Sequence, residues 1–418
     1  MNPTLFQIIS LAIFCIAIVH TFSTKYFEKV AKRSIKHSGI WSLLGEVEVV
    51  FGFWSFVMLI FMYWFEGGEK TVNYIDSRNF REPLFIFAIM VIAGTKQIIQ
   101  FVTSIVKIFA KVIPLKNMVG IYFVTLTIVP LFGSLITEPG AMTLAALILR
   151  ELFYSQNISK KLKYATLGVL FVNISVGGIL TPFAAPPVLM VADKWGWDIW
   201  FMLSNFGWRA IIIVLVNSLS VTFYFQKELK EIKSKPIQEN LILPKSTIVV
   251  HLLLLIGIVY YSHHPVIFLS IFLFFLGITN AYPKYQNKLL IREGLMVAFF
   301  LSGLLVLGGQ QQWWLQKILS EMSLDAIYFG ATVLTAIADN AAITYLGSLV
   351  DGMSDQFKYA LVAGAVTGGG MTVIANAPNP AGFSILKNNF EDGAISAVGL
   401  FVAAILPTFV AILVFKFL

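Results

Sequence analysis

The stretch 338–382 carries polar side chains inside an apolar part of the chain. An ADNAAIT segment is followed by GGGMT and then by VIANAPNPAG. Lipid offers no water to loose backbone, so a helix that breaks in a membrane must be buried in protein or line a polar cavity. A carboxylate at such a break is costly and indicates a functional site. The alternative is a kinked packing helix whose aspartate reaches toward the membrane surface. We predict a cation or proton site formed by Asp339, Asn340, Thr344, Asn376 and Asn379.

A weaker copy of this pattern occurs earlier in the chain. EPGAMT at 138–143 corresponds to DNAAIT at 339–344, and GGILTPFAAPP at 177–187 corresponds to GGMTVIANAPNP at 369–380. The REP at 81–83 and the GTKQ at 94–97 have counterparts at 292–294 and 308–311, in the same order. The copy predicts further oxygen ligands at Glu138, Thr143, Asn173 and Thr181. Glycines that allow close backbone approach and prolines that keep a helix from closing complete both copies: Gly177, Gly178, Gly369, Gly370, Pro186, Pro378 and Pro380.

These residue types suit a small hard cation. Broken helices expose backbone carbonyls that coordinate Na⁺, and carboxylate and amide side chains add further oxygens. Burial raises the pKa of a carboxylate, so one site can hold either Na⁺ or a proton. We expect Asp339 to be the principal shared carboxylate and place the Na⁺ there. For Glu138 the alternative is a carboxylate that only stabilises the start of a helix at its Glu-Pro junction.

Lys96 falls near the middle of a predicted span, where a charge needs a partner. One interpretation is an ion pair with Glu138 or Asp339 that the arriving cation breaks. The other is a structural ion pair that fixes the first repeat.

Composition identifies a polytopic membrane protein. Hydrophobic residues make up 58% of 418 and charged residues 12%, with a mean hydropathy of +0.81. The net charge of +8 comes from short loops between spans, where lysine and arginine set topology, so it does not indicate nucleic-acid binding. The single cysteine, Cys15, excludes a disulfide framework.

The elements that hold these residues are predicted to be helices only. Apolar runs predict spans at about 4–22, 41–65, 83–105, 163–192, 205–226, 246–262, 266–282, 294–312, 357–386 and 394–416. The stretches 118–152 and 325–351 are each predicted to form a re-entrant hairpin, and loop charges place these hairpins on opposite faces. We therefore expect two inverted repeats, 1–226 and 246–418, joined by a cytoplasmic linker at 227–245. Each repeat contains a hairpin and a discontinuous transmembrane helix, at 163–192 in the first and 357–386 in the second.

At these motifs the chain resembles the ion transporter superfamily of arsenite permeases and NhaD-type antiporters. More narrowly, it is similar to a bacterial family described as sodium/proton antiporters. The likeness rests on GEVEVVFG at 45–52, TEPGAMTLAALIL at 137–149 and the two segments within 338–382. It implies that hairpin tips and broken spans form the ion site, and it implies a homodimer. The Ser-Asn-Thr hairpin signatures of the dicarboxylate symporters are replaced by carboxylates here, which favours cation exchange.

We therefore predict a secondary active transporter in the inner (plasma) membrane that exchanges Na⁺ or Li⁺ for protons by alternating access. The alternative function is a sodium- or proton-coupled symporter of a small anion, because helix N-termini at the broken spans also suit an anion. No enzyme is expected, since neither a nucleophile–base pair nor a metal triad lies within the spans. No cofactor is expected, and the partners are small inorganic ions and membrane lipid.

Overall fold

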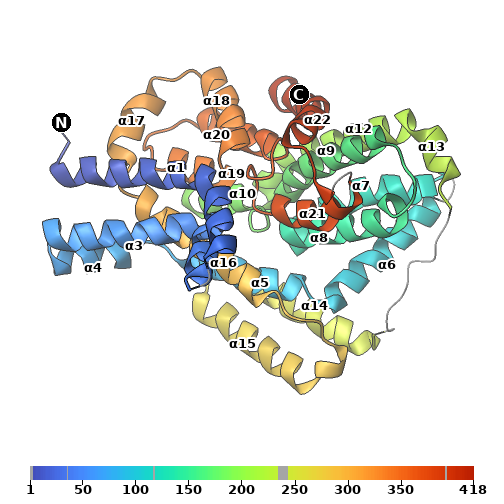
Figure 1. Ribbon diagram of the computed structural model, residues 1–418, viewed down its shortest axis with the longest axis horizontal. Coiled ribbons are helices and arrows are strands. Elements are labelled where there is room, and N and C mark those ends of the chain that lie inside the picture. The colour runs from blue at the N-terminus through green and yellow to red at the C-terminus, as the bar shows by residue number, and fades with distance from the viewer. Residues whose placement is uncertain (1–2, 35, 116–117, 234–242, 391–392) are drawn as a thin grey trace. The chain divides into compact units, whose positions relative to one another are not determined.

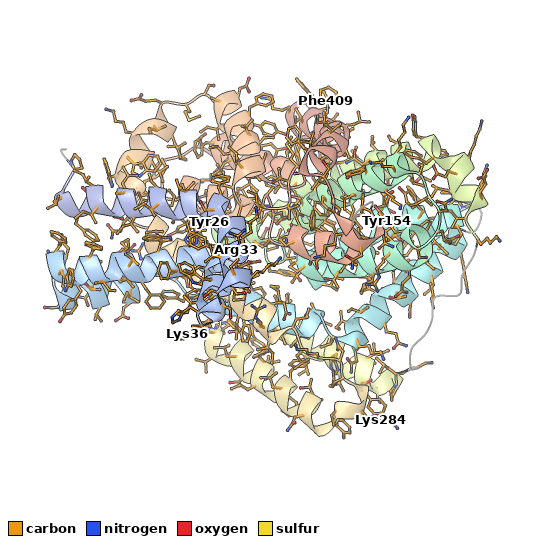
Figure 2. The ribbon with its side chains drawn as sticks, viewed as in Figure 1. Tyr26, Arg33, Lys36, Tyr154, Lys284 and Phe409 are labelled. Carbon is orange, nitrogen blue, oxygen red and sulfur yellow. The ribbon has the colours of Figure 1, made fainter. Side chains whose placement is uncertain are left out.

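The computed structural model describes residues 3–34, 36–115, 118–233, 243–390 and 393–418, and all regular structure in these ranges is helical (Figure 1). Seven of the described helices are long and apolar enough to cross a membrane, or eight if the bent pair α5 and α6 counts as one span. Phe409 of α22 is one of many apolar side chains that stay exposed on these helices (Figure 2). This surface is the one expected of a multi-pass membrane protein. Residues 234–242 of the predicted linker lie outside the described residues.

The chain forms two compact units, and each takes segments from both predicted repeats. The first comprises Met1–Phe87, Ile291–Met322 and Tyr345–Met353. Its helices are α1 (Leu5–Arg33), α2 (Ser38–Leu44), α3 (Val47–Glu66), α4 (Gly68–Asp76), α16 (Ile291–Gly308) and α17 (Gln312–Ser320). The second comprises Ala88–Leu290, Ser323–Thr344 and Ser354–Leu418. The helices α5 (Arg81–Ala93) and α19 (Asn340–Ser348) contribute residues to both.

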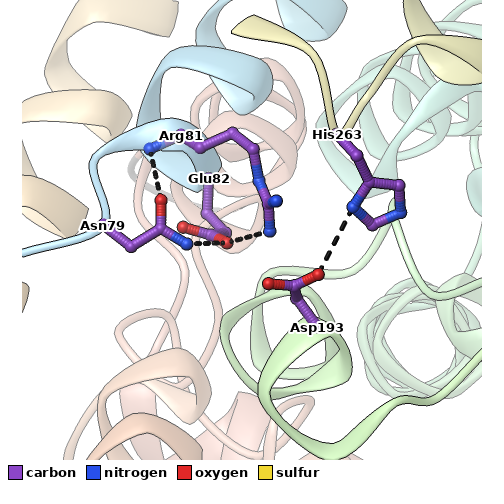
Figure 3. Close-up of polar contacts among 5 residues, drawn as sticks. All are labelled: Asn79, Arg81, Glu82, Asp193 and His263. Atoms are coloured by element: carbon purple, nitrogen blue, oxygen red, sulfur yellow. Dashed lines mark hydrogen bonds and ion pairs between the residues drawn. The ribbon is translucent and has the colours of Figure 1, made fainter.

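In the first unit, α3 packs against α1 and α16. Glycines bring α3 and α16 together, since a Cβ on Gly303 would lie 2.3 Å from the backbone nitrogen of Gly52. At the start of α5, Asn79 and Arg81 both donate to Glu82 Oε1, each at 2.8 Å (Figure 3). The Arg-Glu pair that opens this predicted span therefore fixes its first turn.

The second unit contains most of the predicted site. Its long helices are α7 (Met118–Ile136), α9 (Lys160–Gly177), α12 (Trp208–Tyr224) and α22 (Ala397–Phe417). Shorter helices follow a break in the chain or pack around these: α6 (Lys96–Val112), α8 (Glu138–Leu149), α10 (Pro186–Trp195), α14 (Lys245–Tyr260), α15 (Pro265–Ala281), α18 (Leu324–Ile337), α20 (Asp355–Gly368) and α21 (Asn379–Leu386). In the turn between α14 and α15, Nδ1 of His263 lies 3.3 Å from Oδ1 of Asp193 (Figure 3). His263 therefore lies in a loop, as its position shortly before Pro265 indicates.

The structure breaks the chain at the predicted polar segments. The stretch 118–152 contains α7 and α8, and 325–351 contains most of α18 and α19. The broken segment 163–192 separates into α9 and α10, and 357–386 into α20 and α21. Two details differ from the sequence prediction. The span at 83–105 is bent by 67° between α5 and α6, and α7 alone is long enough to cross a membrane.

Candidate functional site

Glu138 lies at the junction between α7 and α8. The helix cannot continue through Thr137, whose φ of 66° is in the left-handed region, and Pro139 fits the first turn of the new helix because its missing N–H would have no helical partner there. The Glu138 side chain is fully buried. Its Oε2 accepts a hydrogen bond of 2.8 Å from Nδ2 of Asn376, and its Oε1 has no hydrogen-bond partner among the described residues. A buried carboxylate oxygen of this kind is available to a proton or a cation.

Asn376 lies in the segment between α20 and α21, and Asn379 is the first residue of α21. Asn379 Nδ2 donates to the carbonyls of Gly369 and Thr372, at 2.8 Å each, and so holds the opened backbone in shape. Both asparagines are buried, and the Oδ1 atom of each lacks a hydrogen-bond partner in the described part of the chain. Their amide N–H groups are thus used to build the site, while their oxygens remain available.

The segment after α9 packs directly against Glu138. A Cβ on Gly178 would lie 2.5 Å from both Cγ and Oε1 of Glu138, so only a glycine leaves room for the carboxylate. Ser134 of α7 donates to the carbonyl of Gly177 at 2.7 Å, and its hydroxyl accepts from the N–H of Leu180. Thr181 Oγ1 in turn donates to the Ser134 carbonyl at 2.6 Å. These bonds fix the first broken segment to the first hairpin.

Asn340 joins the start of α19 to the same cluster. Its backbone N–H donates to the Ala375 carbonyl at 3.0 Å, next to Asn376. A Cβ on Gly369 would lie 3.0 Å from Nδ2 of Asn340 and 2.2 Å from Oγ of Ser175. The Asn340 side chain is fully buried, and neither of its polar atoms has a hydrogen-bond partner within the described ranges. An amide in this state is the strongest sign of a site prepared for a ligand, because buried polar groups are normally paired.

Asp339 occupies a different position from Glu138. Its carboxylate caps α19, with Oδ1 accepting from the N–H groups of Ala341 at 2.8 Å and Ala342 at 3.3 Å. The side chain is half-buried. Asp339 therefore has a helix-start role at α19, and Glu138 lies in the first turn of α8.

Several other predicted ligands are engaged elsewhere. Asn173 is fully buried, but its Nδ2 donates to the Leu126 carbonyl at 2.9 Å and its Oδ1 accepts from Asn217 at 3.0 Å. The Thr344 hydroxyl donates to the carbonyls of the preceding turn, at Asn340 and Ala341. Thr143 lies five residues after Glu138 in α8, which places it on a different face of that helix.

The remaining predicted residues shape the breaks. Pro186 begins α10, while Pro378 and Pro380 lie at the start of α21. Gly370 brings the backbone against α9, since a Cβ there would lie 2.4 Å from Cα of Val172. Lys96 is the first residue of α6 and is half-buried at the bend after α5.

Sequence reasoning missed Thr137 and the structural role of Ser134. The Thr137 hydroxyl is buried beside Glu138 and lacks a hydrogen-bond partner in the described chain. A signal was present, because a threonine directly before a Glu-Pro pair marks the residue on which the hairpin turns. The role of Ser134 depends on a backbone bond to α9, which the sequence does not show.

The site offers hard oxygen atoms from four chain breaks: a carboxylate, three amide oxygens and the carbonyl ends of broken helices. Among the described residues no group of three or more His, Cys, Asp or Glu side chains could hold a metal ion. The oxygens that the site does provide suit a monovalent alkali cation or a proton.

Comparison with known proteins agrees with this chemistry. The model of the family described as "Putative Na+/H+ antiporter" matches residues 5–418, and no curated protein matches the chain. Since the match covers nearly the whole chain, the protein belongs to this antiporter family and is a membrane transporter, not an enzyme.

Proposed function

We propose that the protein exchanges Na⁺ or Li⁺ for protons by alternating access, with Glu138 as the carboxylate that the two ions share. The observation that carries the proposal is a set of buried oxygens without a hydrogen-bond partner among the described residues, on Glu138 and on the segments that meet near it: Glu138 Oε1, Asn376 Oδ1, Asn379 Oδ1 and Asn340 Oδ1. Leaving such atoms unpaired is costly, and a bound cation offsets that cost. The family supports the identity of both ions.

Burial favours Glu138 over Asp339 as the shared carboxylate. Glu138 is fully enclosed and keeps one oxygen without a partner, whereas Asp339 is half-buried and accepts two backbone hydrogen bonds. A carboxylate that must be neutralised in a dry site has to take either a proton or a cation, and this mutual exclusion couples the two fluxes. Asp339 then contributes a second charge that attracts the cation and holds the hairpin tip in place.

The repeated motifs support inverted repeats and re-entrant hairpins as the moving framework. In this proposal, the two hairpins and the two broken segments carry the ion between openings on either side of the plasma membrane. Homodimerisation and alternating access remain part of the proposal. The side-chain oxygens favour cation exchange over the coupled transport of a small anion, because they are acceptors that would repel an anion.

The test is a proton-flux assay in proteoliposomes with an imposed pH gradient, adding Na⁺, Li⁺ and K⁺ in turn. We expect Na⁺ or Li⁺ to collapse the gradient in the wild-type protein. Glu138→Gln, which nearly preserves shape, should abolish this response, and Asp339→Asn should weaken it. Asp355→Asn is the matched control, because that carboxylate lies on the surface and pairs with Lys358 at 2.8 Å. Undiminished exchange in Glu138→Gln would place the shared carboxylate elsewhere, first at Asp339.

A further inference from the structure

The loop 282–290, which follows α15, clamps the bend between α5 and α6. Asn287 Oδ1 accepts from the N–H of Lys96 at 3.0 Å, and its Nδ2 donates to the Gly94 carbonyl at 3.4 Å. Gln97 Nε2 donates to the Tyr285 carbonyl at 3.2 Å. A break leaves helix-end groups without partners, and here Asn287 supplies partners for two of them, the N–H of Lys96 and the carbonyl of Gly94.

Gln286, the residue between Tyr285 and Asn287, contacts a histidine. His251 of α14 is buried, with Nδ1 at 2.7 Å from the Thr247 carbonyl and Nε2 at 3.4 Å from Nε2 of Gln286. A carbonyl only accepts, so Nδ1 carries the ring proton in the neutral form. Nε2 is then an acceptor, and the Gln286 amide donates to it.

The same contact serves the charged form of the ring. Protonation makes Nε2 a donor as well, and Gln286 then needs to present its oxygen instead of its nitrogen. That oxygen, Oε1, is buried and has no hydrogen-bond partner among the described residues. A rotation of the Gln286 amide group by about 180° exchanges the positions of its Nε2 and Oε1 atoms without moving the ring or the loop. Protonation of His251 therefore gives the unpaired oxygen a partner, which offsets part of the cost of a buried charge.

The two described helices that pack most extensively against α14 are α6 and α15, and neither contains an acidic residue. α15 contains no charged residue, and the charged residues of α6 and the loop are all lysines: Lys96, Lys107, Lys111, Lys284 and Lys288. The edge-on ring of Phe275, 5.6 Å away, covers the imidazole from α15. The contacts that hold a proton on His251 are therefore the hydrogen bonds to Thr247 and Gln286, so the site is sensitive to changes in the Gln286 contact.

We propose that His251 and Gln286 form a second proton-binding site, separate from the exchange site, that transmits pH to the bend between α5 and α6. The connection is short, because Gln286 binds the ring and its two neighbours hold the bend. α6 packs in turn against α7 and α8, the hairpin that carries Glu138. The protonation state of His251 therefore sets the rate of transport, and the proton on His251 is not one of the protons exchanged for Na⁺.

Two measurements test this site, and only the first rests on the proposed exchange function. In proteoliposomes, His251→Gln should shift the half-point of the rate-against-pH curve by roughly half a unit or more, with little change in the maximal rate. Independently of transport, hydrogen exchange of the amides at 94–97 and 282–290 should change across roughly pH 5–8 in the wild type and not in the variant.

The controls separate a proton site from a packing role. His37→Gln removes an exposed histidine and should leave both measurements at wild-type values. Gln286→Met keeps the length of the side chain but removes the amide. It should shift the pH dependence in the way expected of His251→Gln, and it tests the site if His251→Gln fails to fold. A folded His251→Gln protein with wild-type pH dependence of hydrogen exchange overturns the proposal, whatever the flux assay shows.

Discussion

Gly178→Ala tests whether the Glu138 carboxylate must be where the structure places it. The backbone at Gly178 has φ −73° and ψ −11°, which any residue adopts, so the substitution acts through the added methyl group alone. That methyl carbon would lie 2.5 Å from Cγ and Oε1 of Glu138. Contacts between such atoms require roughly 3.5 Å, so the carboxylate or the segment after α9 has to move by about 1 Å.

A shift of this size is enough to break the bond of 2.8 Å between Glu138 and Asn376, because a contact lengthened to about 3.6 Å or more no longer counts as a hydrogen bond. Hydrogen bonds to charged groups contribute about 1.5–3 kcal/mol, which corresponds to roughly a tenfold to hundredfold change in binding. We expect the Na⁺ concentration for half-maximal exchange to rise by that factor in Gly178→Ala. The assay is the proton-flux measurement at a series of Na⁺ concentrations.

Gly277→Ala is the matched control. Gly277 lies within α15, and nothing lies within 4 Å of a Cβ placed there. This variant should keep the wild-type Na⁺ dependence and gain up to about 1 kcal/mol of helix stability. Folded Gly178→Ala protein that reaches half-maximal exchange within about twofold of the wild-type Na⁺ concentration would contradict this position of the carboxylate. A loss of about 1.4 kcal/mol corresponds to a tenfold change in binding, so a twofold change is smaller than the loss of this hydrogen bond requires.

Two further substitutions separate binding residues from structural ones. Asn340→Leu removes a buried amide that lacks hydrogen-bond partners among the described residues. We expect the free energy of unfolding in detergent to stay the same or to rise by up to about 3 kcal/mol, while Na⁺ affinity falls at least about tenfold. A clear loss of stability would contradict a ligand role. Asn173→Leu removes hydrogen bonds to α7 and α12, so we expect it to lower the free energy of unfolding by about 1–3 kcal/mol and to leave the Na⁺ dependence of the folded protein unchanged. A selective loss of Na⁺ affinity in Asn173→Leu would return that residue to the ion site.

The positions of the breaks could be predicted from the sequence because they depend on local chemistry. Clusters of glycine, proline and polar side chains inside apolar runs favour a break, whereas a single proline does not end α7 or α22. The structure divides the chain at Thr137, near Gly178, before Asn340 and after Gly368. The family and the helical class followed from the same segments.

The roles of individual polar residues could not be predicted in the same way. Asn173 and Asn376 look alike in sequence, yet one is held by α7 and α12 while the other donates to Glu138. The difference depends on contacts between segments that lie far apart in the chain. The same is true of Asp339, whose neighbouring backbone N–H groups hold its carboxylate at the start of α19.

The bond between Glu138 and Asn376 joins residues that are 238 positions apart. Ribosomes add roughly 5–20 residues per second, so Glu138 is synthesised on the order of tens of seconds before its partner exists. During that interval the Glu138 carboxylate lacks its amide donor, and a proton can neutralise it without the second half of the chain. The first half of the protein should therefore insert with Glu138 in its acid form, and the cation-binding form is acquired only when the last helices are in place.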